Sequence, residues 1–390
     1  MQRNLFDRDH EAYRETVREF LAREIEPNYE RWESDRLIDR SAWLAAGKSG
    51  IVGLGVPEEF GGSGVTDYRF RYVVAEEIAR TATTSFGSGL SLQDDIAIPY
   101  IVNLGTDEQK QRWLPGMAAG ELIGAIAMTE PGAGSDLQGV KTTAVRDGDE
   151  WVINGQKTFI TNGIHSDLVI VVARTDPGAG SKGFSLLVVE RGMPGFSRGR
   201  KLHKVGLAGQ DTAELVFEDV RVPATNLLGT EGRGFVHLME NLPLERISIA
   251  VNAIAAAKAA YQWTRDYVFE RKAFGKPIGD LQNTRFALAE MLTEIEVTES
   301  HIDRCVLALN ADELTAVDAS KGKWWASELQ KRVVDRCVQL HGGYGYMMEY
   351  PIGRAYVDSR IQTIYGGTTE IMKEIIGRDI ASESDRGPNG

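Results

Sequence analysis

The sequence predicts an α+β protein of three parts: an N-terminal α-helical domain, a central antiparallel β-barrel domain and a C-terminal helical bundle. Two observations lead to this prediction. Apolar residues recur at three- and four-residue spacing before residue 121 and after residue 233, as on amphipathic helices, whereas residues 122–225 carry short β-branched runs. No helix-length pattern separates those runs, which favours an antiparallel barrel or sandwich over a doubly wound sheet. The domains are therefore placed at residues 1–121, 122–232 and 233–390.

Local signals support each part in order. In the first, Thr106 stands where a helix N-cap is expected, directly before DEQKQRWL. In the second, Asn154-Gly155 lies between two strand-like runs and predicts the turn of a hairpin. The third contains three long helical patterns that should pack as a bundle, and it ends in the polar tail SESDRGPNG. The expected core positions are Ile247, Val251, Ile254, Ala257 and Tyr261; Leu288, Leu292, Ile295, Ile302, Val306 and Leu309; and Trp325, Leu329, Val333, Cys337 and Leu340.

The composition excludes several classes of protein. Of the 390 residues, 42% are hydrophobic and 26% charged, as in a soluble globular protein, and the net charge of −12 disfavours a nucleic acid or an anionic membrane as partner. Cys305 and Cys337 lack CxxC spacing, and no histidines lie at metal-ligand spacing, so we expect a reducing, cytoplasmic location and no metal site. The N-terminus has no signal-peptide core, and no apolar run is long enough to span a membrane.

Three glycine-rich or basic stretches could bind a ligand. TEPGAGSD, residues 129–136, lacks the third glycine of a dinucleotide fingerprint and is as compatible with a plain turn. QLHGGYGYM, residues 339–347, could be a helix C-cap followed by a loop. FERKAFGKPI, residues 269–278, is either a solvated basic turn or a site where Arg271 binds phosphate beside the ring of Phe274.

A possible catalytic carboxylate lies in LPLERISIA, residues 242–250. Glu245 and Arg246 are expected at the entry of an apolar helix, where most carboxylates only interact with the helix dipole. A carboxylate buried beside apolar side chains would instead have a raised pKa, which suits a general base. Both interpretations remain open from this stretch alone.

Five stretches, taken in order, resemble the acyl-CoA dehydrogenase family: AMTEPGAGSD, KTFITNG, ERKAFGKPI, QLHGGYGYM and YGGTTEI. The likeness runs from about residue 6 to residue 380. It implies a C-terminal four-helix bundle, FAD between the β-domain and the bundle, and a homotetramer in which a neighbouring bundle reaches the same FAD. It also implies an acyl-CoA substrate, an electron-transfer flavoprotein as acceptor and, in a eukaryote, a mitochondrial matrix location after removal of a transit peptide.

The resemblance also implies cofactor contacts at particular residues. The family often has Trp where this chain has Phe159, which keeps ring stacking but loses an N–H donor. The residues implied to line the flavin are Ile126, Met128, Thr129, Gly134 and Ser135, with Phe159, Ile160 and Thr161 against its ring. Those implied to hold the pyrophosphate and adenine are Arg271, Phe274 and Gln282 across a subunit interface, then Gln339, Leu340, His341, Gly342 and Gly343, and Thr368, Thr369 and Glu370 at a helix start.

The catalytic base departs from the common family pattern. Many members place a Glu directly before the Gly-Thr of the last motif, but this chain has Gly366 there. In the long-chain and isovaleryl branches the base lies on a bundle helix, at the position that matches Glu245. We expect Glu245 to fill the space beside Gly366, whose N–H would still donate to the thioester oxygen. The residues implied to contact substrate are Ser135, Ser181, Lys182, Val236, Pro243, Leu244, Arg246, Gly366 and Gly367.

The implied reaction is FAD-dependent α,β-dehydrogenation of a fatty acyl-CoA. WWASELQ and YGGTTEIMKEIIGR look most like the long-chain branch, and the small residues Gly87, Ser88 and Gly89 are expected at the floor of the acyl pocket. Short branched substrates such as isovaleryl-CoA are the alternative. An oxidase that passes electrons to oxygen, an inactive flavoprotein and a non-catalytic helical scaffold are further alternatives.

Overall fold

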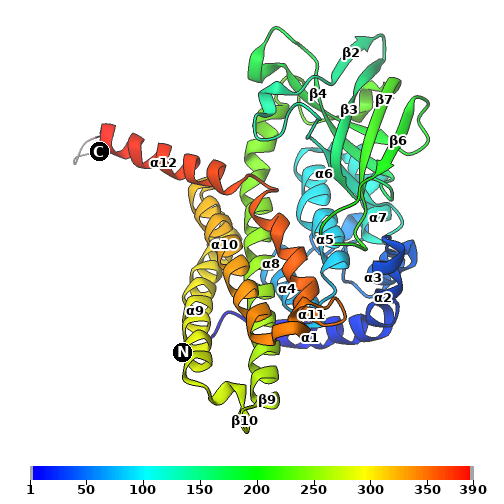
Figure 1. The fold of residues 1–390 in the computed structure, drawn as a ribbon. Helices are drawn as coiled ribbons and strands as arrows, with labels where there is room; N and C mark the ends of the chain where they lie inside the picture. The colour runs from blue at the N-terminus through cyan, green and yellow to red at the C-terminus, as the bar shows by residue number, and fades with distance from the viewer. Residues whose placement is uncertain (1–2, 387–390) are drawn as a thin grey trace.

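The structure, a computed structural model, describes residues 3–386 and shows a helical part, a sheet and a helical bundle in this order (Figure 1). The predicted order of the three parts is confirmed. Thr106 is an N-cap, because its side chain accepts from the Gln109 N–H and the Gln109 side chain accepts in return. The helices of the first part are α1 Arg8–Phe20, α2 Glu26–Asp35, α3 Arg40–Lys48, α4 Arg69–Thr81, α5 Thr84–Leu92, α6 Ile98–Leu104 and α7 Asp107–Ala118, with π-helical turns η1 Leu21–Ile25 and η3 Gln93–Ala97.

The middle part is an eight-stranded sheet whose strands pair in the order β6-β7-β3-β2-β4-β5-β8, with β1 beside β4. Most neighbours are antiparallel, as predicted, but β1 runs parallel to β4 over four residue pairs, and β2 meets β4 in parallel at one. One face packs Ile126, Ile170 and Leu186 against α6 and α7, and the other encloses Trp151 and Val169. The strands are β1 Gly124–Ala127, β2 Thr143–Asp147, β3 Glu150–Thr161, β4 Leu168–Arg174, β5 Phe184–Glu190, β6 Phe196–Lys201, β7 Thr212–Pro223 and β8 Leu227–Leu228.

The predicted hairpin turn at Asn154-Gly155 is wrong. Both residues lie inside strand β3, where the register with β7 shifts between Ile153 and Gly155. A Cβ at Gly155 would lie 2.3 Å from Oγ1 of Thr142, so the glycine permits two segments of the backbone to approach closely at a bulge. The turn lies instead at Gly148 and the residue after it, where β2 meets β3 and Gly148 has a φ of +59°.

The last part is built on α8 Gly234–Glu270, α9 Gln282–Asn310, α10 Ala316–His341 and α12 Thr369–Arg386, with the short α11 Pro351–Ser359. Most predicted core positions are buried, but Leu292 is 38% and Trp325 42% exposed. Trp325 keeps a polar partner at this surface, since its Nε1 donates to Oγ1 of Thr298 at 2.9 Å. The expected polar tail is helical as far as Arg386, and its remaining residues lie outside the described ones. Within residues 3–386, no helix has the length and hydropathy of a membrane span.

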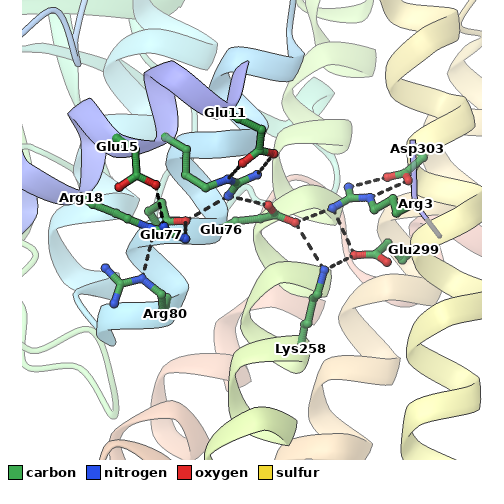
Figure 2. A network of polar contacts seen from close by, with 11 residues as sticks. Arg3, Glu11, Glu15, Arg18, Glu76, Glu77, Arg80, Lys258, Glu299 and Asp303 are labelled. Atoms are coloured by element: carbon green, nitrogen blue, oxygen red, sulfur yellow. Dashed lines mark hydrogen bonds and ion pairs between the residues drawn. The ribbon is translucent and has the colours of Figure 1, made fainter. Parts of the chain in front are cut away.

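A network of charged side chains ties the first residues to α4 and the bundle (Figure 2). Glu76 accepts from Arg3 at 2.5 Å, and Arg3 also pairs with Asp303 of α9 at 2.6 Å. The adjacent Glu77 is buried and pairs with three guanidinium groups, from Arg14 at 3.0 Å, Arg18 at 3.0 Å and Arg80 at 2.6 Å. The network fixes α1 against the helix on which the bundle packs.

We predict that Glu77→Gln lowers the free energy of unfolding by about 3 kcal/mol, because it leaves the buried guanidinium of Arg14 and the partly exposed ones of Arg18 and Arg80 without their shared carboxylate. Burial raises the pKa of Glu77, but hydrogen bonds from Arg18, Arg80 and Arg14 outweigh it and lower the pKa. The stabilisation is therefore present at neutral pH and is lost as the pH falls below about 4.3. Thermal unfolding of the wild-type protein and of Glu77→Gln, between neutral and acidic pH, measures the difference in stability. Glu15→Gln, at an exposed partner of Arg18, should cost about 1 kcal/mol or less, and equal losses for the two variants would contradict the prediction.

Candidate active site

Glu245 lies inside α8, several turns after its start, and not at a helix entry. The helix begins at Gly234 and continues through Pro243, so its first turn ends well before Glu245. The expected position is thus corrected, and an interaction with the N-terminal dipole is excluded because that effect fades within the first turn. The helix start was misplaced for two reasons. The residues before Pro243 show no clear apolar period, and a proline usually interrupts a helix.

The carboxylate of Glu245 is buried, at 4% exposure, between α8 and α6. Tyr100 of α6, itself fully buried, donates its hydroxyl hydrogen to Oε1 of Glu245 at 3.0 Å. Burial raises the pKa of Glu245 to about 7, although the Tyr100 hydrogen bond and the charge of Arg246 act in the opposite direction. A carboxylate with a pKa near neutrality can both accept and release a proton at physiological pH.

Gly366 and Gly367 lie beside the same helix. Their φ angles are +63° and +103°, in the region that favours glycine, and Thr368 then caps α12 by accepting from the Ile371 N–H. A Cβ at Gly366 would lie 2.3 Å from Cδ1 of Ile249, one turn after Glu245. The side chain that fills the space next to Gly366 is therefore Ile249, and the expected filling by the Glu245 carboxylate is wrong.

The segments implied to line a flavin are held together by a buried ion pair. Lys157 of β3 is fully buried and donates to Oε1 of Glu130 at 2.9 Å and to the carbonyl of Met128 at 3.0 Å. The Thr158 N–H donates to the carbonyl of Thr129 at 2.9 Å. The segment of Met128 and Thr129 is thus bonded to β3 at Lys157 and Thr158, directly before Phe159, while the loop residues Gly134 and Ser135 are exposed.

Phe159 shows a feature typical of a ligand contact. Its ring is 68% exposed and its backbone has a φ of +60°, which is costly for a residue with a side chain. An exposed aromatic ring held by a strained backbone contributes nothing to the core of the sheet. It offers a flat apolar face to a ring system.

A hollow of about 480 Å³ gathers another group of the predicted residues at the far end of the bundle. It is lined by Arg271, by the segment Gln339, Leu340, His341, Gly342 and Gly343, and by Tyr267, Ile278, Tyr344 and Met347. Phe274 does not line it: the ring is 93% exposed on the hairpin of β9 Lys272–Ala273 and β10 Lys276–Pro277. Gln282, at the start of α9, is also outside its lining. Figure 1 shows this hairpin at the end of α8 opposite to the sheet.

The residues implied to contact substrate fall into two groups. Ser181 and Lys182 are exposed in the turn Gly180–Gly183. This turn lies close to the start of α8, which carries Val236, because a Cβ at Gly232 would be 2.8 Å from the Lys182 carbonyl. Pro243, Leu244 and Arg246 flank Glu245 on α8. Arg246 is buried, and its Nη1 donates to Oγ of Ser320 at 3.4 Å.

The expected floor of the acyl pocket is wrong. Gly87 and Gly89 are both buried in α5. A Cβ at Gly87 would lie 2.6 Å from Cγ2 of Ile78, and one at Gly89 would lie 3.0 Å from Oδ1 of Asn162 and 3.1 Å from the Trp43 ring. These glycines let helices and a loop pack closely, and the space that their missing side chains leave is filled by Ile78, Asn162 and the Trp43 ring.

Sequence reasoning missed Tyr100, Lys157, Glu130 and Lys323 as parts of this site. Lys323 of α10 is fully buried and donates to the carbonyl of Gly367 at 2.5 Å. Lys157 and Glu130 lie within two of the quoted motifs, but nothing in those motifs shows that they pair. Tyr100 and Lys323 carry no local signal, because their partners are far away in sequence.

Comparison with known proteins identifies the family. Models of the N-terminal, middle and C-terminal domains of acyl-CoA dehydrogenases match residues 7–121, 125–220 and 232–381. The chain belongs to the acyl-CoA dehydrogenase family. It is 52% identical, over 98% of its length and 89% of the relative's, to the long-chain specific acyl-CoA dehydrogenase of Rattus norvegicus mitochondria.

Solved acyl-CoA dehydrogenase structures superimpose on most of the chain. The enzyme from Geobacillus kaustophilus matches with a TM-score of 0.94 and 49% identity, over 96% of this chain and 98% of that one. The acyl-CoA dehydrogenase from Bacillus anthracis, complexed with FAD, matches with a TM-score of 0.91 and 33% identity, over 98% of this chain and 68% of that one. The fold and the enzyme class expected from the sequence are thereby confirmed, and this acyl-CoA dehydrogenase catalyses acyl-CoA dehydrogenation.

Proposed function

We propose that the enzyme converts long-chain acyl-CoA thioesters to trans-2-enoyl-CoA with FAD as cofactor and Glu245 as the catalytic base. The observation that carries this proposal is the buried carboxylate of Glu245, whose pKa lies near 7 and whose only hydrogen-bond donor among the described residues is Tyr100. Such a group can accept the weakly acidic proton next to a thioester. Glu245 lies one turn of α8 before Ile249, whose side chain faces Gly366.

The residues of this chain act on the substrate in three ways. Glu245 takes the proton from the α-carbon, and Tyr100 holds the carboxylate in one orientation before transfer. The backbone N–H of Gly366 donates to the thioester oxygen, where negative charge develops as the proton leaves. The buried surroundings of Glu245 exclude water, which strengthens both interactions.

The residues present fit FAD. Phe159 offers an exposed ring on a strained backbone, and Thr161 and the Thr129 loop lie beside it. The first N–H groups of α12 favour phosphate. Arg271 and the glycines at 342 and 343 provide a charged, open hollow suited to a second phosphate-bearing portion. When bound, FAD supplies the acceptor for hydride from the β-carbon. We further propose a homotetramer, with that hollow serving a neighbouring subunit, and an electron-transfer flavoprotein as acceptor.

Two observations support the long-chain preference. The motifs WWASELQ and YGGTTEIMKEIIGR resemble the long-chain branch, and a relative with that name is 52% identical over almost the whole chain. The test is anaerobic flavin reduction by butyryl-, isovaleryl-, octanoyl- and palmitoyl-CoA. We expect palmitoyl-CoA to give the highest rate relative to its half-saturating concentration. Faster reduction by butyryl- or isovaleryl-CoA would contradict the chain-length assignment, and no reduction by any thioester would contradict the activity.

A further inference from the structure

Lys323 is a buried cation that neither the fold nor the reaction so far explains. It lies on α10 with no exposed surface, and its ammonium donates to the carbonyl of Gly367 at 2.5 Å. Among the side chains of residues 3–382, no carboxylate lies within ion-pair distance of it. Burial, followed by the charge of Arg246, lowers its pKa to about 8, while the charges of Glu328 and Glu370 act in the opposite direction. The ammonium is thus still mostly protonated at neutral pH.

Packing alone does not account for this lysine. A buried ammonium loses its hydration, and a single backbone carbonyl replaces only part of it. A methionine or leucine of similar length would fill the same space in α10 without that cost. A second buried cation, Arg246, lies close by and has an Nε without a hydrogen-bond partner. Arg246 interacts with the charge of Glu245, but Lys323 has no carboxylate in contact, and two neighbouring buried cations are a costly arrangement of a kind that is concentrated at functional sites.

The carbonyl that Lys323 binds belongs to the most adaptable backbone in the site. Gly366 and Gly367 are consecutive and both have positive φ angles, so neither side chains nor helical hydrogen bonds fix their peptide planes. A hydrogen bond from a charged donor is about twice as strong as one between neutral groups. The Lys323 contact therefore fixes the Gly367 carbonyl and anchors one end of the two-glycine turn, whose other end carries the Gly366 N–H.

We propose that Lys323 is a positioning residue that, through the Gly367 carbonyl, holds the Gly366 N–H toward the thioester oxygen of the acyl-CoA substrate. This inference rests on the proposed function of Gly366. The lysine touches no reacting atom and acts only through the backbone between α10 and α12. Ile249 closes the other side of Gly366, so the peptide is held from two helices.

The test uses the holoenzyme with ¹³C-labelled trans-2-hexadecenoyl-CoA, which binds without turnover. Difference infrared spectroscopy measures the stretching frequency of the labelled thioester carbonyl, which falls when the oxygen accepts a stronger hydrogen bond. The variants are Lys323→Met, which removes the ammonium at similar volume, and Lys323→Gln, which keeps a neutral donor and serves if the Met variant does not fold. Lys321→Met is the matched control, because Lys321 is exposed on the same helix and pairs only with Asp318.

We expect the wild-type enzyme and Lys321→Met to lower the carbonyl frequency relative to free thioester, and both Lys323 variants to lose at least half of that shift. Flavin content should stay unchanged, while the rate of flavin reduction by palmitoyl-CoA falls by about 10²-fold. A wild-type shift that persists in the Lys323 variants would overturn the role of Lys323 and leave Gly366 as the donor. A wild-type enzyme without any shift would instead overturn the proposed role of Gly366, and the role of Lys323 with it.

Discussion

Glu245→Gln is expected to slow flavin reduction by palmitoyl-CoA by about 10²–10⁴-fold, because an amide cannot accept the α-proton. Anaerobic stopped-flow absorbance at saturating thioester measures this rate. The substrate should still bind, since the amide keeps the shape of the side chain and can still accept the Tyr100 hydrogen bond. Glu240→Gln, at an exposed carboxylate on the same helix, should reduce its flavin at the wild-type rate. A Glu245→Gln enzyme as fast as wild type would show that the base is another group.

The pH dependence of the wild-type rate should carry the same signature. The pKa of Glu245 is about 7, so its base form is depleted as the pH falls through 7 and the rate should fall with it. The raised pKa also means that folding becomes less favourable as the pH rises from the ordinary carboxyl value to about 7. Glu245→Gln does not titrate, so we expect its melting temperature to exceed that of wild type above pH 7. An inactive variant that is more stable than wild type separates the role in catalysis from a role in folding.

Glu130→Gln is expected to lower the free energy of unfolding by about 3–5 kcal/mol, because it leaves the fully buried Lys157 without its carboxylate. A glutamine keeps only one acceptor oxygen, so its NH2 group would face either the Lys141 N–H, now 2.6 Å from Oε2, or the Thr142 hydroxyl, now 2.6 Å from Oε1. Chemical denaturation monitored by circular dichroism measures the loss. Flavin affinity should fall too, because the pair joins the Thr129 loop to the strand that carries Phe159.

A double-mutant cycle separates the ion pair from the other contacts of Glu130. Lys157→Met in the Glu130→Gln background should recover part of the lost stability, because it removes the uncompensated cation. Asp136→Asn serves as the control, since that carboxylate is exposed in the same loop. Losses that simply add in the double variant would show that the two side chains contribute independently.

Local patterns predicted what depends on local physics. The helical period and its return after residue 233 fixed the order of the three parts, and the Thr106 cap followed from a side chain that bonds its own helix. The family resemblance singled out Arg271 and Gln339 to Gly343, which are 68 residues or more apart and line one hollow. Periodicity alone could not have joined these two segments.

The wrong predictions concern features that depend on a distant partner. Asn154-Gly155 looks like a hairpin turn, but the approach of Thr142 makes it a bulge inside a strand. Gly87 and Gly89 look like space for a ligand, yet Ile78 and Trp43 already occupy that space. Tyr100 and Lys323 escaped notice for the same reason, since only the folded chain brings them to Glu245 and Gly367.

The environment of Gly366 restricts how this enzyme could evolve. A glutamate at position 366 would have to adopt a φ of +63° and would meet Ile249 at its first side-chain atom. Placing the base at position 366 would therefore also require the end of the Ile249 side chain to turn away and the new residue to accept a left-handed backbone. The location of the base should thus be inherited with its surroundings, as a block of residues that separates one branch of the family from another.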